Sequence, residues 1–297
     1  MEANVICFGE VLWDVFPSGE KIGGAPLNVA LRLNALGVKT KIASRVGKDD
    51  LGKRLLDFVE RENLSCDLIQ VDAAHETGQV LVHLDENGSA NYTIEHPAAW
   101  DKIEALTDLV DQVKACDAFL FGSLVARDTV AKATLDQLLN HANYKVFDVN
   151  LRAPHYSIPL LGALMNKADF IKFNDDELGE ISQALGCKED NMEQQIRFIA
   201  KQTQTKTICV TTGSEGALLY QDGKLISQAG FPIKVKDTVG AGDSFLATLL
   251  EGLLNKKPAQ EALKRACAMG ALVAGSTGAN PRICEVKLST FIQQHAS

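Results

Sequence analysis

The stretch DTVGAGDSF, residues 237–245, carries the clearest structural signal in this 297-residue chain. Two glycines flank Ala241, and an apolar run with helical spacing follows over residues 245–254. Glycine permits positive φ angles and lets the backbone approach a ligand closely. The free N–H groups and positive dipole end of the following helix point to the same place. The stretch therefore predicts a helix start that forms an anion hole, suited to a phosphoryl group with developing charge.

Outward from this stretch, short apolar runs alternate with amphipathic stretches, which indicates an α/β fold with a mostly parallel central sheet flanked by helices. The predicted buried strands are residues 5–8, 41–46, 118–122, 145–149, 169–173 and 207–211. The predicted helices are residues 26–36, 51–62, 129–141, 175–185, 192–202, 241–255 and 258–274. No linker rich in Pro, Gly or Ser divides the sequence, so we expect residues 1–297 to form a single domain.

One region departs from this alternation. Residues 77–84 and 90–94 alternate polar and apolar around the turn sequence DENG at 85–88, which predicts a hairpin. Residues 11–16 and the stretch near Lys21 are also strand-like, so we expect a small β-rich lid from segments of about 11–22 and 77–100. An isolated hairpin is only marginally stable in water, which favours a homodimer that supports the lid. A lid that docks on its own sheet is the alternative.

The composition, with 46% hydrophobic and 23% charged residues, is that of a globular protein. The formal charge of −8 argues against nucleic acid or an anionic membrane as a partner, although a few local groups can still hold a nucleotide. Seven cysteines are scattered singly, which favours reduced thiols buried in the core. The N-terminus lacks a basic region and no apolar run reaches the ~20 residues of a membrane span, so we expect a cytoplasmic protein.

Asp243 falls in the first turn of the predicted helix. Taken alone, such a carboxylate is more often a cap or a complement to the helix dipole than a functional group. The stretch is not a dinucleotide fingerprint, because a third glycine is missing at 245 and the first strand lies far away. A dinucleotide-dependent oxidoreductase is therefore rejected. The chain also contains no phosphate-binding sequence of the form G-x-x-x-x-G-K-[ST].

A second group of residues is GGAPLNVA at 23–30, which leads to Gly37. The paired glycines bring backbone next to a ligand, and proline suits the first turn of a helix. Asn28 would project from that turn, either into a site or into water. Upstream, Glu10 and Asp14 follow the first strand, where ligands of open α/β sheets bind. Asp14 is thus placed to accept hydrogen bonds from hydroxyl groups, or is an ordinary loop carboxylate.

At this point a family resemblance becomes specific. Residues 23–37 and 237–245 resemble the two signatures of the ribokinase-like (PfkB) carbohydrate kinases, and VGKDDLG (46–52), NDDE (174–177) and TTGSEG (211–216) also match family segments. The similarity spans residues 5 to about 282 and implies the three-layer ribokinase-like fold. Within the family, GEVLWD (9–14), GGAP (23–26), FGSL (121–124) and FDVNLR (147–152) are most similar to bacterial fructokinases.

The resemblance implies roles for individual residues. Asp243 would accept the proton of the attacking sugar hydroxyl, as an ordinary ionised Asp with a pKa near ~3.9. The backbone N–H groups that would hold the transferred phosphoryl belong to Gly240, Ala241 and Gly242. The implied sugar contacts are Asp14, Gly24, Asn28, Ser123, Arg152 and Asp243. A surface arginine is the alternative for Arg152.

The resemblance also implies ATP and metal ions as ligands. The implied ATP contacts are Asn174, Thr211, Gly213, Ser214 and Gly216. Glu177 would order water around Mg²⁺ beside the phosphates. Alternatively, residues 175–177 are simply the acidic, solvent-exposed start of a helix.

Many family members bind a monovalent cation such as K⁺ beside the anion hole. Asp237 and the carbonyl of Val239 match that position. Further candidate carbonyl donors are those of Val273, Ser276 and Gly278. However, Arg282 stands where some relatives place a small hydroxyl residue, and a guanidinium there would replace or repel the cation.

Together, these features lead us to expect an ATP-dependent sugar kinase that converts D-fructose to fructose 6-phosphate. A 2-keto-3-deoxygluconate kinase, a ribokinase and a nucleoside kinase are alternatives within the family. A non-catalytic sugar or nucleotide sensor on the same fold is the alternative from a different class, since a fold does not fix function. The residues that face the sugar do not choose among these substrates.

Overall fold

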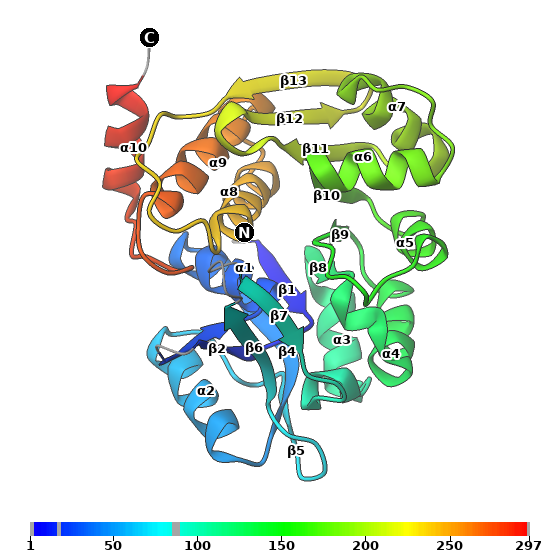
Figure 1. Cartoon of the computed structure of the whole chain (residues 1–297), viewed down its shortest axis with the longest axis vertical. Helices are drawn as coiled ribbons and strands as arrows, with labels where there is room; N and C mark the ends of the chain where they lie inside the picture. The colour runs from blue at the N-terminus through cyan, green and yellow to red at the C-terminus, as the bar shows by residue number, and fades with distance from the viewer. Residues whose placement is uncertain (1–2, 17–18, 85–89, 296–297) are drawn as a thin grey trace.

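The computed structural model describes residues 3–16, 19–84 and 90–295, and a nine-stranded sheet runs through its centre (Figure 1). The strand order is β13-β12-β11-β10-β9-β8-β1-β4-β5. The strands are β1 (Asn4–Phe8), β4 (Lys39–Gly47), β5 (Ile69–Asp72), β8 (Ala118–Gly122), β9 (Lys145–Asp148), β10 (Phe170–Asn174), β11 (Thr207–Thr211), β12 (Gly216–Gln221) and β13 (Lys224–Ala229). All pairs from β11 to β5 are parallel, whereas β12 and β13 add an antiparallel edge.

Inner strands of this sheet, such as β1 and β8, are apolar on both faces because helices cover both. In β1, Val5 and Cys7 belong to one core cluster, while Ile6 and Phe8 belong to the other. This alternation follows from the two-residue period of a strand and explains the unbroken apolar runs in the sequence.

The helices divide between the two clusters. One face is covered by α1 (Ala25–Ala35), α2 (Asp50–Arg61), α8 (Ala241–Leu254), α9 (Ala259–Ala274) and α10 (Glu285–Gln294). The other face is covered by α3 (Thr107–Ala115), α4 (Thr129–Leu139), α5 (Ile158–Met165), α6 (Asp175–Ala184) and α7 (Met192–Thr203). The predicted α/β class and its three layers are thus confirmed.

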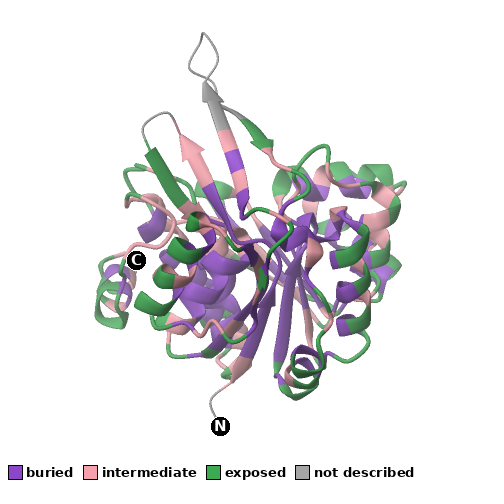
Figure 2. Cartoon of the chain, turned by 90° about the horizontal axis from the view of Figure 1, so that it is seen from below, coloured by how far each residue is buried: buried purple, intermediate pink, exposed green. Residues whose placement is uncertain are grey.

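A separate four-stranded sheet, in the order β3-β2-β6-β7, projects from one end of the molecule (Figure 2). Its strands are β2 (Leu12–Phe16), β3 (Gly19–Gly23), β6 (Gly78–Leu84) and β7 (Ala90–Ile94). Two distant segments meet in it through the parallel pairing of β2 with β6. The predicted small β-rich unit is therefore present. The turn predicted at 85–88 lies outside the described residues, and residues 99–102 form a short 3₁₀ helix rather than strand.

All seven cysteines are free thiols. Five are buried, as predicted, and Cys66 is half-buried. The prediction is wrong for Cys284, which is exposed because it directly precedes α10 at the surface. Within the described residues, no helix combines the length and apolar character needed to cross a membrane.

Candidate active site

The stretch that opened the sequence forms a tight turn followed by α8. Gly240 adopts a left-handed conformation with φ of 75°, and a Cβ atom there would lie 2.6 Å from Cα of Ala279. Only glycine fits this position without strain. Helix α8 then begins at Ala241, so Asp243 lies in its first turn, as predicted. We call residues 237–243 the catalytic turn, after the role that the family resemblance implies for Asp243.

The backbone N–H groups of this turn are only partly free. The N–H of Ala241 donates to the carbonyl of Thr238 at 3.2 Å. The first N–H groups of a helix lack intrahelical acceptors, and those of Gly242 and Asp243 have no acceptor among the described residues. Of the three predicted N–H donors, Gly240 and Gly242 therefore remain free among the described residues, Ala241 does not, and Asp243 is added.

Asp243 is held by a chain of side-chain amides. Its Oδ2 accepts a hydrogen bond from Nδ2 of Asn28 at 2.8 Å. Oδ1 of Asn28 in turn accepts one from Nδ2 of Asn280 at 2.7 Å. Asn28 is buried rather than turned to water, because α1 packs against α8. Residues distant in sequence thus meet at this carboxylate.

Burial raises the pKa of Asp243 to about 6, and the negative charge of Asp148 adds to this effect. The hydrogen bond from Asn28 and the charges of Lys172 and Arg152 oppose the shift. Asp243 is thus a stronger base than the ordinary Asp assumed from the sequence, yet it is mostly ionised at neutral pH.

Beneath the turn lies an ion pair that the sequence analysis did not identify. Nζ of Lys172 is 3.0 Å from Oδ1 of Asp148, and the two side chains are only 8% and 3% exposed. Burial opposes protonation, but the carboxylates of Asp148 and Glu177 raise the pKa of Lys172 above its usual value. A Cβ at Gly242 would lie 3.6 Å from Nζ. A buried cation therefore lies next to Gly242 of the catalytic turn.

Glu177 is buried rather than solvated. It forms a capping box with Asn174. Oε2 of Glu177 accepts a hydrogen bond from the N–H of Asn174 at 2.8 Å, and Oδ1 of Asn174 accepts one from the N–H of Glu177 at the same distance. Oε1 accepts the N–H of Leu151 at 2.9 Å. Each carboxylate oxygen keeps a second lone pair, and Oδ2 of nearby Asp148 is buried with no partner among the described residues. Such oxygens fit a hydrated Mg²⁺, which prefers to keep several of its waters. Within the described residues, no group of three ligating side chains could hold an ion directly.

The predicted sugar contacts lie where the two sheets meet. Asp14 is on β2 of the small sheet rather than in a loop, and its carboxylate fills the space that a side chain at Gly23 would need. Gly24 has φ of 111°, and a Cβ there would overlap the carbonyl of Glu10. Burial raises the pKa of Glu10 to about 7, and its Oε2 has no partner among the described residues.

Arg152 and Ser123 complete this group. Arg152 is exposed, but its charge opposes the rise that burial causes in the pKa values of Glu10, Asp14 and Asp243. Its guanidinium therefore lies near all three carboxylates. Ser123 is buried, and its Oγ donates to the carbonyl of Asn150 at 3.4 Å. These side chains therefore combine carboxylates, which can accept hydrogen bonds from hydroxyl groups, with the single positive charge of Arg152.

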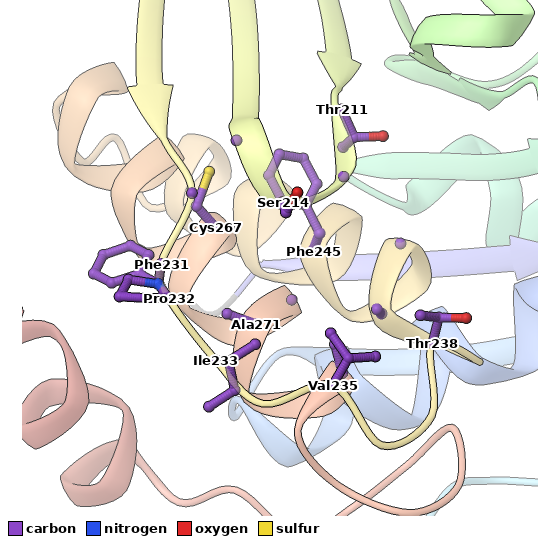
Figure 3. Close-up of a pocket in the computed structure, with 17 residues that line it drawn as sticks. Thr211, Ser214, Phe231, Pro232, Ile233, Val235, Thr238, Phe245, Cys267 and Ala271 are labelled. Atoms are coloured by element: carbon purple, nitrogen blue, oxygen red, sulfur yellow. The ribbon is translucent and has the colours of Figure 1, made fainter.

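A cavity of about 440 Å³ opens on the other side of the catalytic turn (Figure 3). It falls within the size range of small-molecule sites. Four of the predicted ATP contacts line it: Thr211, Gly213, Ser214 and Gly216. The fifth predicted contact, Asn174, does not line the cavity. The apolar wall of the cavity is formed by side chains that were not predicted from the sequence: Phe231, Pro232, Ile233, Val235, Phe245, Cys267 and Ala271. Ala241 and Gly242 also line it, so the cavity reaches the anion-binding turn.

The predicted monovalent-cation position holds a compact loop. Asp237 accepts hydrogen bonds from the N–H groups of Val239 and Gly278, both at 3.1 Å, and Nζ of Lys21 lies 4.0 Å away. The carbonyl of Val273 accepts the N–H of Ser276 at 2.8 Å. The Arg282 side chain is 90% exposed and lies 3.8 Å from Glu62, so its guanidinium turns to solvent beside α2 instead of pairing with Asp237.

A cavity of nucleotide size, a helix start with free N–H groups and a buried carboxylate beside further polar side chains are the features expected of a small-molecule kinase. The chain belongs to the pfkB family of carbohydrate kinases, whose family model matches residues 4–284. This confirms the resemblance found in the sequence.

Individual relatives agree with the family. A fructokinase of Klebsiella pneumoniae is 28% identical over 273 residues, which is 85% of each chain. The structure of a Vibrio cholerae fructokinase with fructose, ADP and calcium ion bound superimposes with a TM-score of 0.83 at 25% identity, over 98% of this chain and 99% of the other. A Xylella fastidiosa fructokinase with bound ATP gives a TM-score of 0.87 at 21% identity over all of both chains, which shows the shared fold.

Proposed function

We propose that this carbohydrate kinase transfers the γ-phosphoryl group of ATP to D-fructose, giving fructose 6-phosphate and ADP. The observation that carries the proposal is the position of Asp243. It lies at the anion-binding start of α8, between the 440 Å³ cavity and the group of hydroxyl acceptors, with its pKa raised to about 6. The similarity to fructokinases, one of which was solved with fructose and ADP, supports fructose as the acceptor.

In the proposed reaction, Asp243 accepts the proton of the sugar hydroxyl as that oxygen bonds to the γ-phosphorus. The bond from phosphorus to the bridging oxygen breaks, and ADP leaves. The N–H groups of Gly240, Gly242 and Asp243 stabilise the charge on the transferred group, with Lys172 behind them. Base catalysis of this kind contributes about 10²–10⁴-fold.

Asp14, Asn28, Ser123 and Arg152 are the proposed sugar contacts, with the small sheet covering them as a lid that excludes water. If this is so, bound sugar slows hydrogen exchange in β6, the strand that pairs with the strand carrying Asp14. Exchange in residues 78–84 would be compared with and without fructose. Equal rates would show that the small sheet does not respond to the sugar.

Thr211, Gly213, Ser214 and Gly216 are the proposed contacts to ATP, with Asn174 at the start of α6 behind them. Glu177 and the free oxygen of Asp148 would hold the waters of Mg²⁺, which neutralises phosphate charge when bound. For K⁺, the position of Arg282 outside the Asp237 loop removes the objection raised from the sequence. Turnover in potassium chloride that exceeds turnover in tetramethylammonium chloride would support a K⁺ site at Asp237 and Val239.

A panel of sugars tests the substrate. D-fructose, 2-keto-3-deoxygluconate, D-ribose and nucleosides would be compared by kcat/KM in a coupled assay of ADP release. We expect fructose to lead. A higher kcat/KM for another acceptor would replace the substrate and leave the kinase activity in place. Binding of sugar or nucleotide without ADP release from any acceptor would indicate a sensor.

We also propose that the chain forms a homodimer through the small sheet. Tyr92, on its edge strand β7, is 64% exposed, which is unusual for a large aromatic side chain. Light scattering of the purified protein measures the mass directly. A monomer at concentrations that support full turnover would contradict the proposal.

A further inference from the structure

A second cavity, of about 690 Å³, lies behind the catalytic turn. It is bounded by the C-terminal parts of α1 and α2 and by residues 280–284, which lead into α10 (Figure 1). It shares no lining residue with the nucleotide-sized cavity of Figure 3. Neither the proposed sugar contacts nor the proposed ATP contacts line it, so the proposed reaction makes no use of it.

This second cavity is positively charged in a chain whose formal charge is −8. Arg32, Arg61 and Arg282 line it together with one acidic residue, Glu62, which leaves a net charge of +2. Arg61 and Arg282 are exposed side chains that can turn toward a ligand. A dianion of modest size would balance this charge.

Arg32 is the most informative of the three, because it is only 3% exposed and bonds to neutral groups. Its Nε donates to Oγ of Ser244 at 3.1 Å and its Nη2 to the carbonyl of Pro281 at 2.9 Å. No carboxylate pairs with it among the described residues, and its Nη1 has no partner there. A buried cation without an anion is costly, and an anion in the adjoining cavity would relieve that cost.

The cavity is joined to the catalytic turn by two short chains of hydrogen bonds. One runs from Arg32 to Ser244, the neighbour of Asp243 in the first turn of α8. The other runs from Asn280, which lines the cavity, through Asn28 to Asp243. A ligand that moves either group therefore acts on the proposed base without entering the active site.

We propose that this cavity is a regulatory site for a phosphate monoester of sugar size, held by Arg32, Arg61 and Arg282. A phosphate monoester carries a charge of about −1.5 to −2 at neutral pH and suits the planar donors of arginine. A monocarboxylate would leave half of the charge unbalanced. The volume exceeds the needs of inorganic phosphate alone and leaves room for a polyol.

Titration calorimetry tests this with glycerol 3-phosphate as the probe, with the active site filled by fructose and a non-hydrolysable ATP analogue with Mg²⁺. We expect one molecule bound per chain, and glycerate, with a single negative charge, binding at least about tenfold more weakly. The double variant Arg61→Ala/Arg282→Ala should lose at least about tenfold in affinity. Arg197→Ala, an exposed arginine paired with Glu193 on α7, is the matched control and should bind as wild type.

No heat of binding in wild type up to about 10 mM would overturn the proposal, since affinities weaker than this have no regulatory use. Equal affinity in the double variant would do the same, because binding would then lie elsewhere. The comparison of the double variant with wild type does not depend on which sugar the enzyme phosphorylates, because both arginines lie outside the proposed active site.

The link to the active site has its own readout. Glycerol 3-phosphate should change kcat or the KM for sugar of the wild type at least twofold, and should leave the double variant unaffected. By reciprocity, sugar should change the affinity of the probe by the same factor as the probe changes the affinity of the sugar. Binding without any such change would show that the two chains of hydrogen bonds do not couple the sites.

Discussion

Replacing Asp243 by Asn should make the protein more stable while nearly abolishing its activity. Burial and the nearby Asp148 raise the pKa of Asp243 to about 6, which means that the folded protein disfavours the charged form. Asn has the shape of the neutral acid and can still accept a hydrogen bond from Asn28. The variant therefore removes an unfavourable charge and leaves the packing intact.

The magnitude follows from the pKa difference between the two states. An unfolded Asp titrates near ~3.9, so a folded value of about 6 corresponds to roughly 3 kcal/mol at pH 8, where both states are ionised. Because Asp243 keeps some access to solvent, we expect a gain of about 1–3 kcal/mol for the variant. The folded acid protonates first as the pH falls through 6. Wild type thus regains stability below pH 6, and the advantage of the variant should roughly halve by pH 5 and vanish below about pH 4.

Urea unfolding of wild type and Asp243→Asn at pH 8, 6 and 5 measures this difference, and kcat at pH 8 should fall by at least about 10²-fold. The matched control is Asp50→Asn, an exposed Asp in the first turn of α2, which should change stability by less than about 0.5 kcal/mol at every pH. If Asp243→Asn is no more stable than wild type at pH 8, the buried charge of Asp243 does not destabilise the folded protein. Near-normal turnover would remove Asp243 from the role of base.

Three further substitutions probe the surroundings of the base. Lys172→Met breaks a buried ion pair and should lower the free energy of unfolding in urea by about 3–5 kcal/mol. The control Lys114→Met breaks an exposed pair and should lower it by at most about 1 kcal/mol. Similar losses in the two variants would contradict the buried pair. Gly240→Ala and Gly186→Ala both place Ala at positive φ, at a cost of roughly 1–2 kcal/mol in stability. Only the Cβ at 240 meets Ala279, so only Gly240→Ala should lower kcat more than tenfold. Ala271→Leu places a larger side chain in the cavity of Figure 3. It should raise the KM for ATP about tenfold and leave the KM for sugar unchanged. A change in the KM for sugar alone would show that the nucleotide binds elsewhere.

Much of the fold was predictable because local signals agreed with the final packing. All six predicted strands and seven predicted helices are present, since buried strands and amphipathic helices have distinct periods. The missed elements had weaker signals. The edge hairpin β12–β13 mixes polar with apolar residues, and α5 is short and almost wholly apolar. The pairing of β2 with β6 joins residues more than 60 positions apart, which no local pattern reveals.

The catalytic turn was predictable because its glycines, helix start and carboxylate are contiguous. Two of its neighbours were not predictable, because only the fold brings Lys172 close to Asp243 and Asn280 to Asn28. One signal was nevertheless available. A lysine inside the apolar strand FIKFN requires a buried anion, and the neighbouring strand VFD supplies Asp148. The apolar wall of the cavity in Figure 3 gave no signal, because its residues look like core in the sequence.

The charge pattern around the turn explains why this site would favour the metal complex of ATP over free ATP. Besides burial, the charges of Asp243 and Asp148 raise the pKa of Glu10, and that of Asp148 raises the pKa of Asp243. Lys172 already pairs with Asp148. A polyphosphate that enters without a cation would add negative charge to this enclosure, where low dielectric strengthens repulsion. The free oxygen of Asp148 could hold a hydrated divalent ion there, which would reverse the sign of that interaction. Asp148, whose charge raises the pKa of the proposed base, would therefore also select the charge state of the nucleotide.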